Sequence, residues 1–424
     1  MLTHRCPARP DRGDRIRGHH LLRVLSRRFD VDLACTSDTP VTGEDRRTLH
    51  ALVDRLAIEP IGPIGGTVRA VRAIGAGDPI TPAWHHRKAL ARRLDSWHRE
   101  IPFDVVLCIC TGMLDYARGL LHPRSTAWPH GRPTAVREPT LLLDLVDVDS
   151  RKWRCLARRS RPPRRWLYRM ESTRLRRVEK EAVRFCDALT VVSNHEALAF
   201  RRHVEPTALP NVVGNGVDLE HYEPLADPAT RSPAFVGVLD YEPNVEGIRW
   251  FVHEVLPALQ RRSRAAGRLK LFIASRRPCR KIWALEKHPA VTILGSVADV
   301  RRVLEKASVV IAPLRMARGI QNKVLEAMAC GRPVICSPQA PEGIDARAGE
   351  HLVVADQPEQ WAQSVDELLS NPERRKQLSL SARALVERRY GWARRLAPMA
   401  DLITTLAEQR ARTRTHNFLS RAAA

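Results

Sequence analysis

Residues 317–337 read ARGIQNKVLEAMACGRPVICS, and this stretch decides the fold class. Gly319 permits a close approach of the backbone, and the residues from Val324 to Met328 have the apolar spacing of a helix. Gly331 suits the left-handed position after a helix end, and the run from Pro333 to Cys336 predicts a strand. A loop, a helix and a strand in this order are typical of a doubly wound parallel sheet.

Three polar residues, Gln321, Asn322 and Lys323, stand where this helix would begin. Ligands of parallel sheets bind beyond the carboxyl ends of the strands, where helix N-termini present free N–H groups and a partial positive charge. The stretch therefore predicts a bound anion, and phosphate above all.

The chain has 424 residues and a formal net charge of +23, which comes from arginine. This length favours two domains. The charge favours anionic partners, such as nucleotides, nucleic acid or an acidic membrane surface. A high-GC genome also enriches ordinary surfaces in arginine, so the charge alone does not decide between these alternatives.

The nine cysteines contain no CxxC pair, which favours reduced thiols and a cytosolic protein. The first residues, MLTHRCPARPDRGDR, contain no apolar signal run, and no later window approaches a membrane-spanning length of apolar residues. We therefore expect no transmembrane segment. The first predicted strand, LTHR, is short, and the sequence leaves open whether the natural start lies a few residues earlier.

Two series of strand-like and helix-like segments follow each other along the chain. They predict a first domain over 1–207, a connector over 208–232 and a second domain over 233–390. A further helix is expected over 391–411, followed by a basic disordered tail over 412–424. Two open α/β domains joined in this way would leave a cleft for ligands.

Four segments carry a resemblance to a known family. NGVD (215–218), FVG (235–237), residues 294–314 and GIQNKVLEAMACGRPVI (319–335) together resemble the donor half of retaining GT-B glycosyltransferases of the family 4-like, or group 1, type. The resemblance implies a GT-B fold, in which two doubly wound Rossmann-like domains face each other with their parallel sheets across a cleft. It also implies that the helix over 391–411 returns to the first, acceptor-side domain.

The N-terminal part resembles a narrower group. Residues 3–33 and LLLDLVDVDSRKW (141–153) are similar to the sugar transferases associated with PEP-CTERM/exosortase exopolysaccharide clusters. This resemblance implies a polyprenyl-linked glycan as the acceptor and a cytoplasmic enzyme that associates peripherally with the inner face of the membrane.

The family resemblance implies roles for residues of the opening stretch. Glu326 would accept hydrogen bonds from the ribose of the nucleotide, and the backbone N–H groups around Gln321 to Lys323 would contact the diphosphate. Arg318 stands where the family usually has a glutamate, and it could bind phosphate instead. We expect Arg318 and Lys323 to be the catalytic cations. The donor-binding residues would be Gly237, Asn244, Arg276, Gly319, Gln321, Asn322 and Glu326.

A second departure from the family follows the FVG segment. Many relatives place an arginine and a lysine there, whereas this chain has Val238, Leu239 and Asp240. The charge of a diphosphate would then be neutralised by Arg318, Lys323 and Arg276, and no metal or cofactor is expected.

On the acceptor side we expect Gly13, Arg17 and Asp147 to face the cleft. The DVD triplet at 147–149 resembles a metal-binding pattern of another glycosyltransferase fold, but GT-B enzymes generally do not use it, and a helix N-cap role is equally open. The basic run over 151–177, with Trp153 and Trp166, predicts either a membrane-facing surface or a solvated helix pair.

The expected activity is the transfer of a sugar from a nucleotide-diphosphate-sugar to a lipid-linked glycan, with retention of the anomeric configuration. A nucleotide-sugar hydrolase or epimerase on the same fold is the alternative. The charge alone suggests a nucleic-acid-binding protein, but the sequence contains no recognisable module for that purpose. The donor base, the sugar and the linkage cannot be predicted from one sequence.

Overall fold

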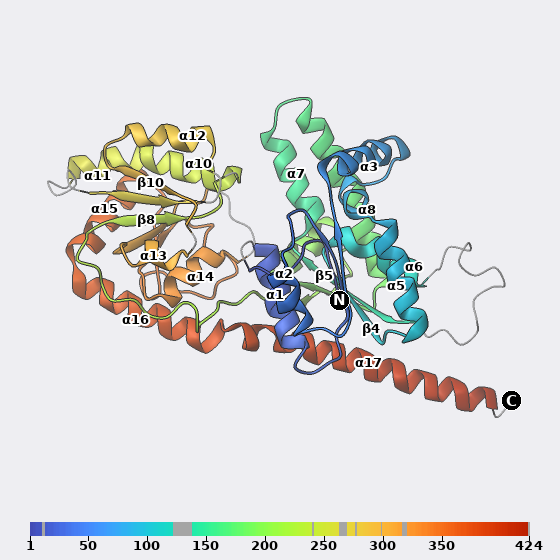
Figure 1. Ribbon diagram of the computed structural model, residues 1–424. Helices are drawn as coiled ribbons and strands as arrows, with labels where there is room; N and C mark the ends of the chain where they lie inside the picture. Colours follow the sequence, from blue (N-terminus) through green and yellow to red (C-terminus); the bar gives the residue numbers. More distant parts are fainter. Residues whose placement is uncertain are drawn as a thin grey trace. The chain divides into compact units, whose positions relative to one another are not determined.

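The computed structural model of the chain describes residues 1–10, 13–121, 138–239, 241–262, 269–275, 278–297, 299–315 and 320–422. The chain divides into two compact units (Figure 1). The first unit comprises Met1–Gly214 and Leu396–Ala424, and the second comprises Asn215–Arg395. The second unit is therefore an insertion in the sequence of the first.

The first unit contains a sheet of seven parallel strands in the order β3-β2-β1-β4-β5-β6-β7. The inner strands are apolar, as expected for strands buried on both faces. In chain order the strands are β1 (Leu2–Thr3), β2 (Leu33–Ser37), β3 (Leu56–Pro60), β4 (Val105–Ile109), β5 (Thr140–Val146), β6 (Ala188–Val191) and β7 (Asn211–Val212).

Helices connect these strands, and a last helix returns from the second unit. They are α1 (Gly13–Leu25), α2 (Gly43–His50), α3 (Pro63–Ala76), α4 (Ile80–His85), α5 (Lys88–Glu100), α6 (Leu114–Leu121), α7 (Asp149–Arg159), α8 (Arg164–Phe185), α9 (Asn194–His203) and α17 (Trp392–Ala422), with a 3₁₀ turn at Thr111–Met113. Helices α7 and α8 pack against each other as an antiparallel hairpin, with the rings of Trp153 and Tyr168 5.1 Å apart (Figure 1).

The second unit contains six parallel strands in the order β10-β9-β8-β11-β12-β13. They are β8 (Pro233–Val236), β9 (Leu271–Ala274), β10 (Val291–Gly295), β11 (Val309–Ala312), β12 (Val334–Cys336) and β13 (Val353–Val354). The helices are α10 (Glu242–Trp250), α11 (Leu256–Arg262), α12 (Arg280–Trp283), α13 (Arg301–Leu304), α14 (Asn322–Ala329), α15 (Pro358–Ser370) and α16 (Pro372–Arg389), with a π turn at Phe251–Val255 and a 3₁₀ turn at Ala284–Lys287.

Each central strand of this sheet sends alternate side chains into two separate apolar cores. Val309 and Ile311 of β11 belong to the core beneath α10, α11 and α15, whereas Val310 and Ala312 belong to the core beneath α14 and α16. Alternation with a period of two is what a strand buried on both faces requires. The opening stretch of the sequence thus forms α14 and β12 at the centre of a doubly wound sheet.

Three features differ from the expectations above. The predicted connector contains β7, an edge strand of the first sheet, and the second unit already begins at Asn215. The predicted tail from residue 412 continues α17 as far as Ala422. Beyond Pro398 this segment has no proline or glycine to end a helix, and its alanines and arginines are good helix formers.

Within the part of the chain that the structure describes, no helix is long and apolar enough to cross a membrane.

Candidate functional site

Helix α14 forms in the stretch where the sequence predicts a bound anion. Gln321 is its N-cap and Asn322 its first residue. Gly331 follows the helix end with φ of +66°, the left-handed conformation that glycine adopts without strain. The expected Arg318 and Gly319 lie just before α14 but outside the described residues, as does Arg276.

Lys323, on the first turn of α14, is held by residues of another βα unit. Its Nζ donates a hydrogen bond of 2.6 Å to Oδ1 of Asn244, which lies on α10. The same Nζ lies 5.1 Å from the centre of the Phe235 ring of β8, within the range of a cation–π contact. Burial lowers the pKa of Lys323 to about 7, and the nearby charge of Glu326 opposes this shift.

The loop after β8 leaves little room for a side chain at Gly237. A Cβ at this position would lie 3.1 Å from the Phe235 ring and 3.2 Å from Nδ2 of Asn244. That Nδ2 donates to the carbonyl of Val238 at 2.8 Å, which fixes the orientation of the Asn244 amide. The structure thus brings three of the expected residues, Gly237, Asn244 and Lys323, into one cluster.

Glu326 lies one turn further along α14, on the same face as Lys323. Its carboxyl group is paired with the hydroxyl of Tyr222. Burial raises the pKa of Glu326 to about 7, although the hydrogen bond from Tyr222 and the charge of Lys323 act in the opposite direction. The pKa of Tyr222 is raised as well, first by burial and then by the charge of Glu326.

Tyr222 was not among the residues expected from the sequence. It belongs to the segment interpreted there as a connector, and Arg383 of α16 holds that segment against α14. The guanidinium of Arg383 donates hydrogen bonds of 2.6 Å to the carbonyls of both Tyr222 and Ala329. A tyrosine in a glycine- and proline-rich segment gives no sequence signal of a contact with a glutamate more than a hundred residues away.

Asn322 buries its side-chain oxygen Oδ1 without a hydrogen-bond partner within the described ranges. Such a group costs free energy unless something binds to it. Asn322 lies directly before Lys323, so the acceptor is at the start of α14, where the helix also presents backbone N–H groups.

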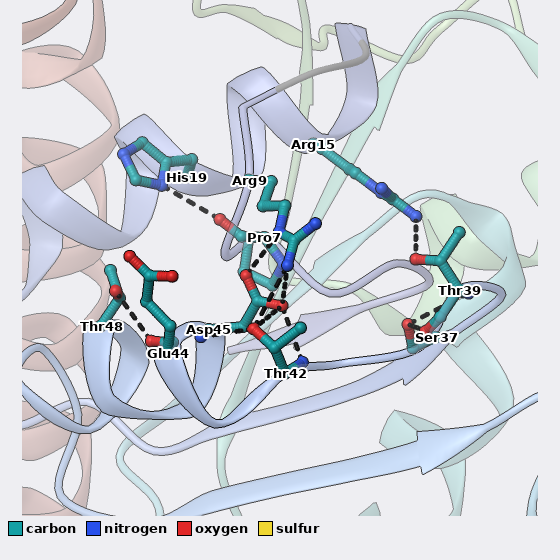
Figure 2. A network of polar contacts seen from close by, with 10 residues as sticks. All are labelled: Pro7, Arg9, Arg15, His19, Ser37, Thr39, Thr42, Glu44, Asp45 and Thr48. Carbon is teal, nitrogen blue, oxygen red and sulfur yellow. Dashed lines mark hydrogen bonds and ion pairs between the residues drawn. The ribbon is translucent and has the colours of Figure 1, made fainter. Parts of the chain in front are cut away.

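In the first unit, the loop after β1 is fixed by an ion-pair network (Figure 2). The guanidinium of Arg9 donates to both carboxyl oxygens of Asp45, at 2.7 and 2.9 Å, and Asp45 also completes a capping box with Thr42 at the start of α2. Arg15 donates to Thr39 at 2.9 Å, after the end of β2. Gly13, the first residue of α1, is exposed, and its Cα faces open space.

Arg17 differs from the expectation that it faces a cleft. Its side chain and that of Asp144 are both 0% exposed, and Nε of Arg17 donates to Oδ2 of Asp144 at 2.6 Å. Thr190 of β6 donates to the same carboxylate at 2.9 Å. Arg17 is therefore a core residue that pairs α1 with β5, because a buried guanidinium needs a charged partner. Asp147 is half-exposed beyond the end of β5.

Two non-glycine residues at neighbouring strand ends have a left-handed backbone. Cys110 follows β4 with φ of +69°, and Val146 ends β5 with φ of +64°. Strained conformations of this kind persist only where the surroundings enforce them, and they are frequent at functional sites. They mark the carboxyl edge of β4 and β5 as a second candidate surface.

The aspartates at 147–149 do not gather into a metal site. Asp149 accepts a hydrogen bond of 2.6 Å from the hydroxyl of Thr111, and Val148 rather than an aspartate occupies the N-cap of α7. Across the described residues, no group of three or more His, Cys, Asp or Glu side chains is arranged to hold a metal ion.

Two parallel-sheet α/β units of seven and six strands define the GT-B class of fold. Residues 231–371 match the family model Glycosyl transferases group 1, so the second unit carries a domain of that family. No curated protein sequence matches the chain.

Solved structures share this fold over nearly the whole chain. Sucrose-phosphate synthase from Thermosynechococcus elongatus is 15% identical, with a TM-score of 0.65 over 99% of this chain and 98% of its own. WaaG, a glycosyltransferase involved in lipopolysaccharide biosynthesis, is 14% identical, with a TM-score of 0.65 over 95% of this chain and 100% of its own. HepE from Anabaena, solved in complex with UDP and glucose, is 15% identical, with a TM-score of 0.61 over 98% of both chains.

Proposed function

We propose that the protein is a glycosyltransferase that takes its sugar from a nucleotide-diphosphate-sugar. The observation that carries this proposal is the cluster of Lys323, Asn244 and Glu326 around the start of α14, in a domain that matches a glycosyltransferase family model. The structures of HepE with UDP and with UDP-glucose support a nucleotide-sugar as the donor class.

Each group in the cluster has a part in donor binding. The ammonium group of Lys323 and the backbone N–H groups of the first turn of α14 bind the diphosphate, because both present positive charge at one point. The unpaired Oδ1 of Asn322 accepts from a donor hydroxyl. The carboxylate of Glu326, held by Tyr222, accepts hydrogen bonds from the ribose hydroxyls.

The reaction breaks the bond between the anomeric carbon and a diphosphate oxygen and forms a bond from that carbon to an acceptor hydroxyl oxygen. Negative charge grows on the leaving diphosphate, so cations placed there lower the barrier. Lys323 does this in our proposal, and Arg318 and Arg276 are the further cations expected from the sequence. The acceptor proton passes to a phosphate oxygen of the leaving group, and the anomeric configuration is retained without a metal ion.

The acceptor is a lipid-linked glycan in exopolysaccharide synthesis, and the enzyme works at the inner face of the cytoplasmic membrane. The resemblance of the N-terminal segments and the excess of basic residues support this finer assignment. The strained ends of β4 and β5 support the choice of this sheet edge as the acceptor surface in our proposal. A hydrolase or epimerase of nucleotide-sugars would share the donor cluster but would need no acceptor.

The purified protein is to be incubated with UDP-, GDP-, dTDP- and ADP-sugars, with and without a polyprenyl-linked glycan, while free nucleoside diphosphate is measured. A transferase releases it in proportion to the acceptor added. Release of nucleoside diphosphate that does not depend on the acceptor identifies a hydrolase. Loss of the sugar nucleotide without release of nucleoside diphosphate identifies an epimerase. Either result overturns the proposal.

Glu326→Ala should weaken binding of the donor nucleotide about tenfold or more, because it removes charge-assisted hydrogen bonds to the ribose. Titration calorimetry measures this affinity, and far-UV circular dichroism checks that the fold is intact. The matched control is Glu373→Ala, since Glu373 is exposed on α16. Equal nucleotide affinity of the Glu326 variant and this control would remove Glu326 from the site.

A further inference from the structure

Helix α3 of the first unit has its large apolar side chains on the outside. Ile64, Val68 and Val71 are 81%, 49% and 62% exposed, and Ile74 beside them is 38% exposed. At 100° per residue, Ile64, Val68 and Val71 lie within a narrow sector of one helix face. A helix on the surface of a globular protein normally turns such a face towards the core.

The opposite face of α3 is made of small residues and is fixed to the protein. A Cβ on Gly66 would lie 2.7 Å from the ring of Trp84 of α4, so only glycine permits this close packing. Ala73 is buried on the same face, and Arg69 donates to the carbonyls of Ala83 and Trp84 at 3.1 and 2.9 Å. The helix is therefore held in an orientation that directs its isoleucine and valine side chains to the solvent.

Helix α8 ties α3 to the basic hairpin of α7 and α8. The guanidinium of Arg174 donates to the carbonyls of Ala73, Ile74 and Asp78 at the end of α3, at 3.4, 3.1 and 2.8 Å. Figure 1 shows α3 beside α8 in the first unit. The two elements therefore form one surface region of that unit.

This region combines apolar side chains with positive charge and has few acidic groups. Helix α3 contains no Asp or Glu, and neither does the segment over 150–170, which contains nine Lys or Arg residues. Arg161, Arg164 and Arg165 of this segment are exposed, next to Trp166, which is 67% exposed. Exposed apolar side chains flanked by arginine and an indole are the combination that binds an anionic lipid surface.

We propose that α3 is the membrane-docking element of this protein, with its apolar stripe Ile64, Val68 and Val71 inserted at the level of the lipid headgroups. The arginines of the α7–α8 hairpin supply the electrostatic attraction to anionic lipids. A second protein chain fits less well as the partner. A stable interface buries ~800 Å² on each partner, and so few side chains can bury only a small part of that area. The proposal deepens the proposed function, on which it rests, since it names the surface that would contact the membrane holding a lipid-linked acceptor.

The experiment is co-sedimentation of the full-length protein with vesicles of phosphatidylcholine, with and without phosphatidylglycerol. The wild type should bind the anionic vesicles, and high salt should weaken this binding without abolishing it. The combined variant Ile64→Gln/Val68→Gln/Val71→Gln should bind at least tenfold more weakly at both salt concentrations. A matched control, Leu198→Gln/Leu380→Gln, removes exposed leucines of α9 and α16 and should bind like the wild type.

A second variant separates the contribution of the arginine charges to vesicle binding from the contribution of the inserted apolar side chains. Arg161→Gln/Arg164→Gln/Arg165→Gln should lose the preference for anionic vesicles but keep the salt-resistant part of the binding. If the α3 variant binds vesicles as the wild type does, the proposal is wrong. It is equally wrong if sedimentation velocity shows that the wild type is a dimer that the α3 variant dissociates, because the stripe would then be a protein interface.

Nucleotide binding in solution distinguishes failure of this proposal from failure of the proposed function. The α3 variant should show the same thermal shift with the donor nucleotide as the wild type, since the donor cluster lies in the second unit. Vesicle binding without any nucleotide binding would overturn the glycosyltransferase assignment alone. Nucleotide binding with unchanged vesicle binding in the α3 variant would overturn the docking assignment alone.

Discussion

Lys323 and Glu326 have pKa values that approach each other from opposite sides. Burial favours the neutral form of each group, so the pKa of the ammonium group falls to about 7 and that of the carboxyl group rises to about 7. At neutral pH, small changes in the surroundings can therefore move protons on or off both groups. Under the proposed function, a bound diphosphate is such a change, because its negative charge would favour the protonated amine.

Proton linkage follows from this at the residue scale. At pH 8 the free protein holds Lys323 mostly as the neutral amine, and a diphosphate raises its pKa, so binding should take up protons. At pH 6 Glu326 is mostly protonated, and accepting ribose hydroxyls requires the carboxylate, so binding should release protons. Calorimetry of nucleotide binding in buffers with different ionisation enthalpies measures both effects.

The variant Lys323→Met should no longer take up protons when the nucleotide binds at pH 8. The control variant Lys376→Met should still take them up, because Lys376 is an exposed residue of α16. Binding enthalpies that are independent of the buffer at both pH values would contradict the assignment of these two groups.

The sequence identified part of this cluster and missed the rest. Lys323 stands out because a polar helix start follows an apolar strand, and Glu326 was implied by the family resemblance. Their partner Tyr222 comes from a segment without periodicity, and its role depends on how Arg383 fixes that segment. Arg17 was expected in a cleft because it belongs to a polar segment after the first predicted strand, but its partner Asp144 lies 127 positions away and gives no local signal.

At the scale of elements, helix α8 supports the ends of two short neighbouring helices. Glu171 accepts from the backbone N–H groups of Ile80 and Thr81 at 2.7 and 2.8 Å, at the start of α4. Arg174, one turn along, donates to carbonyls at the end of α3. A carboxylate at a helix start and a cation at a helix end both match the helix dipole.

Glu171→Ala should lower the free energy of unfolding by about 3 kcal/mol, because it leaves two partly buried N–H groups and the hydroxyl of Thr81 without their carboxylate acceptor. Glu181→Ala on the same helix is the control, with an expected effect within about 0.5 kcal/mol, since Glu181 forms an exposed ion pair with Arg118. Chemical denaturation monitored by circular dichroism measures both changes. Equal stabilities of the two variants would show that Glu171 does not cap α4.

Helix and strand prediction worked where the pattern was long or uniformly apolar. Long stretches of helical pattern form α8 and α15, and uniformly apolar runs form β4, β5 and β11. The region from α2 to α5 gave no assignment, because its helices mix arginine with small residues and β3 is only half-buried. The orientation of α3 could not be foreseen, since its apolar period predicts burial of the face that the structure exposes.

At the scale of the whole molecule, α17 belongs to the first unit although it follows the second in sequence. Leu396 and Met399 are fully buried, and Arg28 of the first unit donates to Asp401 at 2.7 Å. Further along, Arg410 pairs with Glu138 and Asp187 of the same unit. The helix therefore completes the packing of the first unit.

Deletion of residues 396–424 should destabilise the first unit by several kcal/mol, because it removes fully buried leucine and methionine side chains. Scanning calorimetry should show a lower unfolding temperature for the first unit. The unfolding transition whose temperature rises when a donor nucleotide is added should be unchanged. Deletion of residues 413–424 alone is the control and should leave both transitions in place. A first-unit transition that survives the longer deletion would show that α17 contributes nothing to that unit.

The first unit begins at the first residue of the chain but is complete only when α17 has been added. The order in which the two units begin to be synthesised therefore differs from the order in which they can finish folding. A ribosome finishes every residue of the second unit before it delivers the helix that the first unit lacks. The second unit can therefore fold before the first unit has its last element, and the nascent first unit exposes the surface that Leu396 and Met399 later cover throughout that interval.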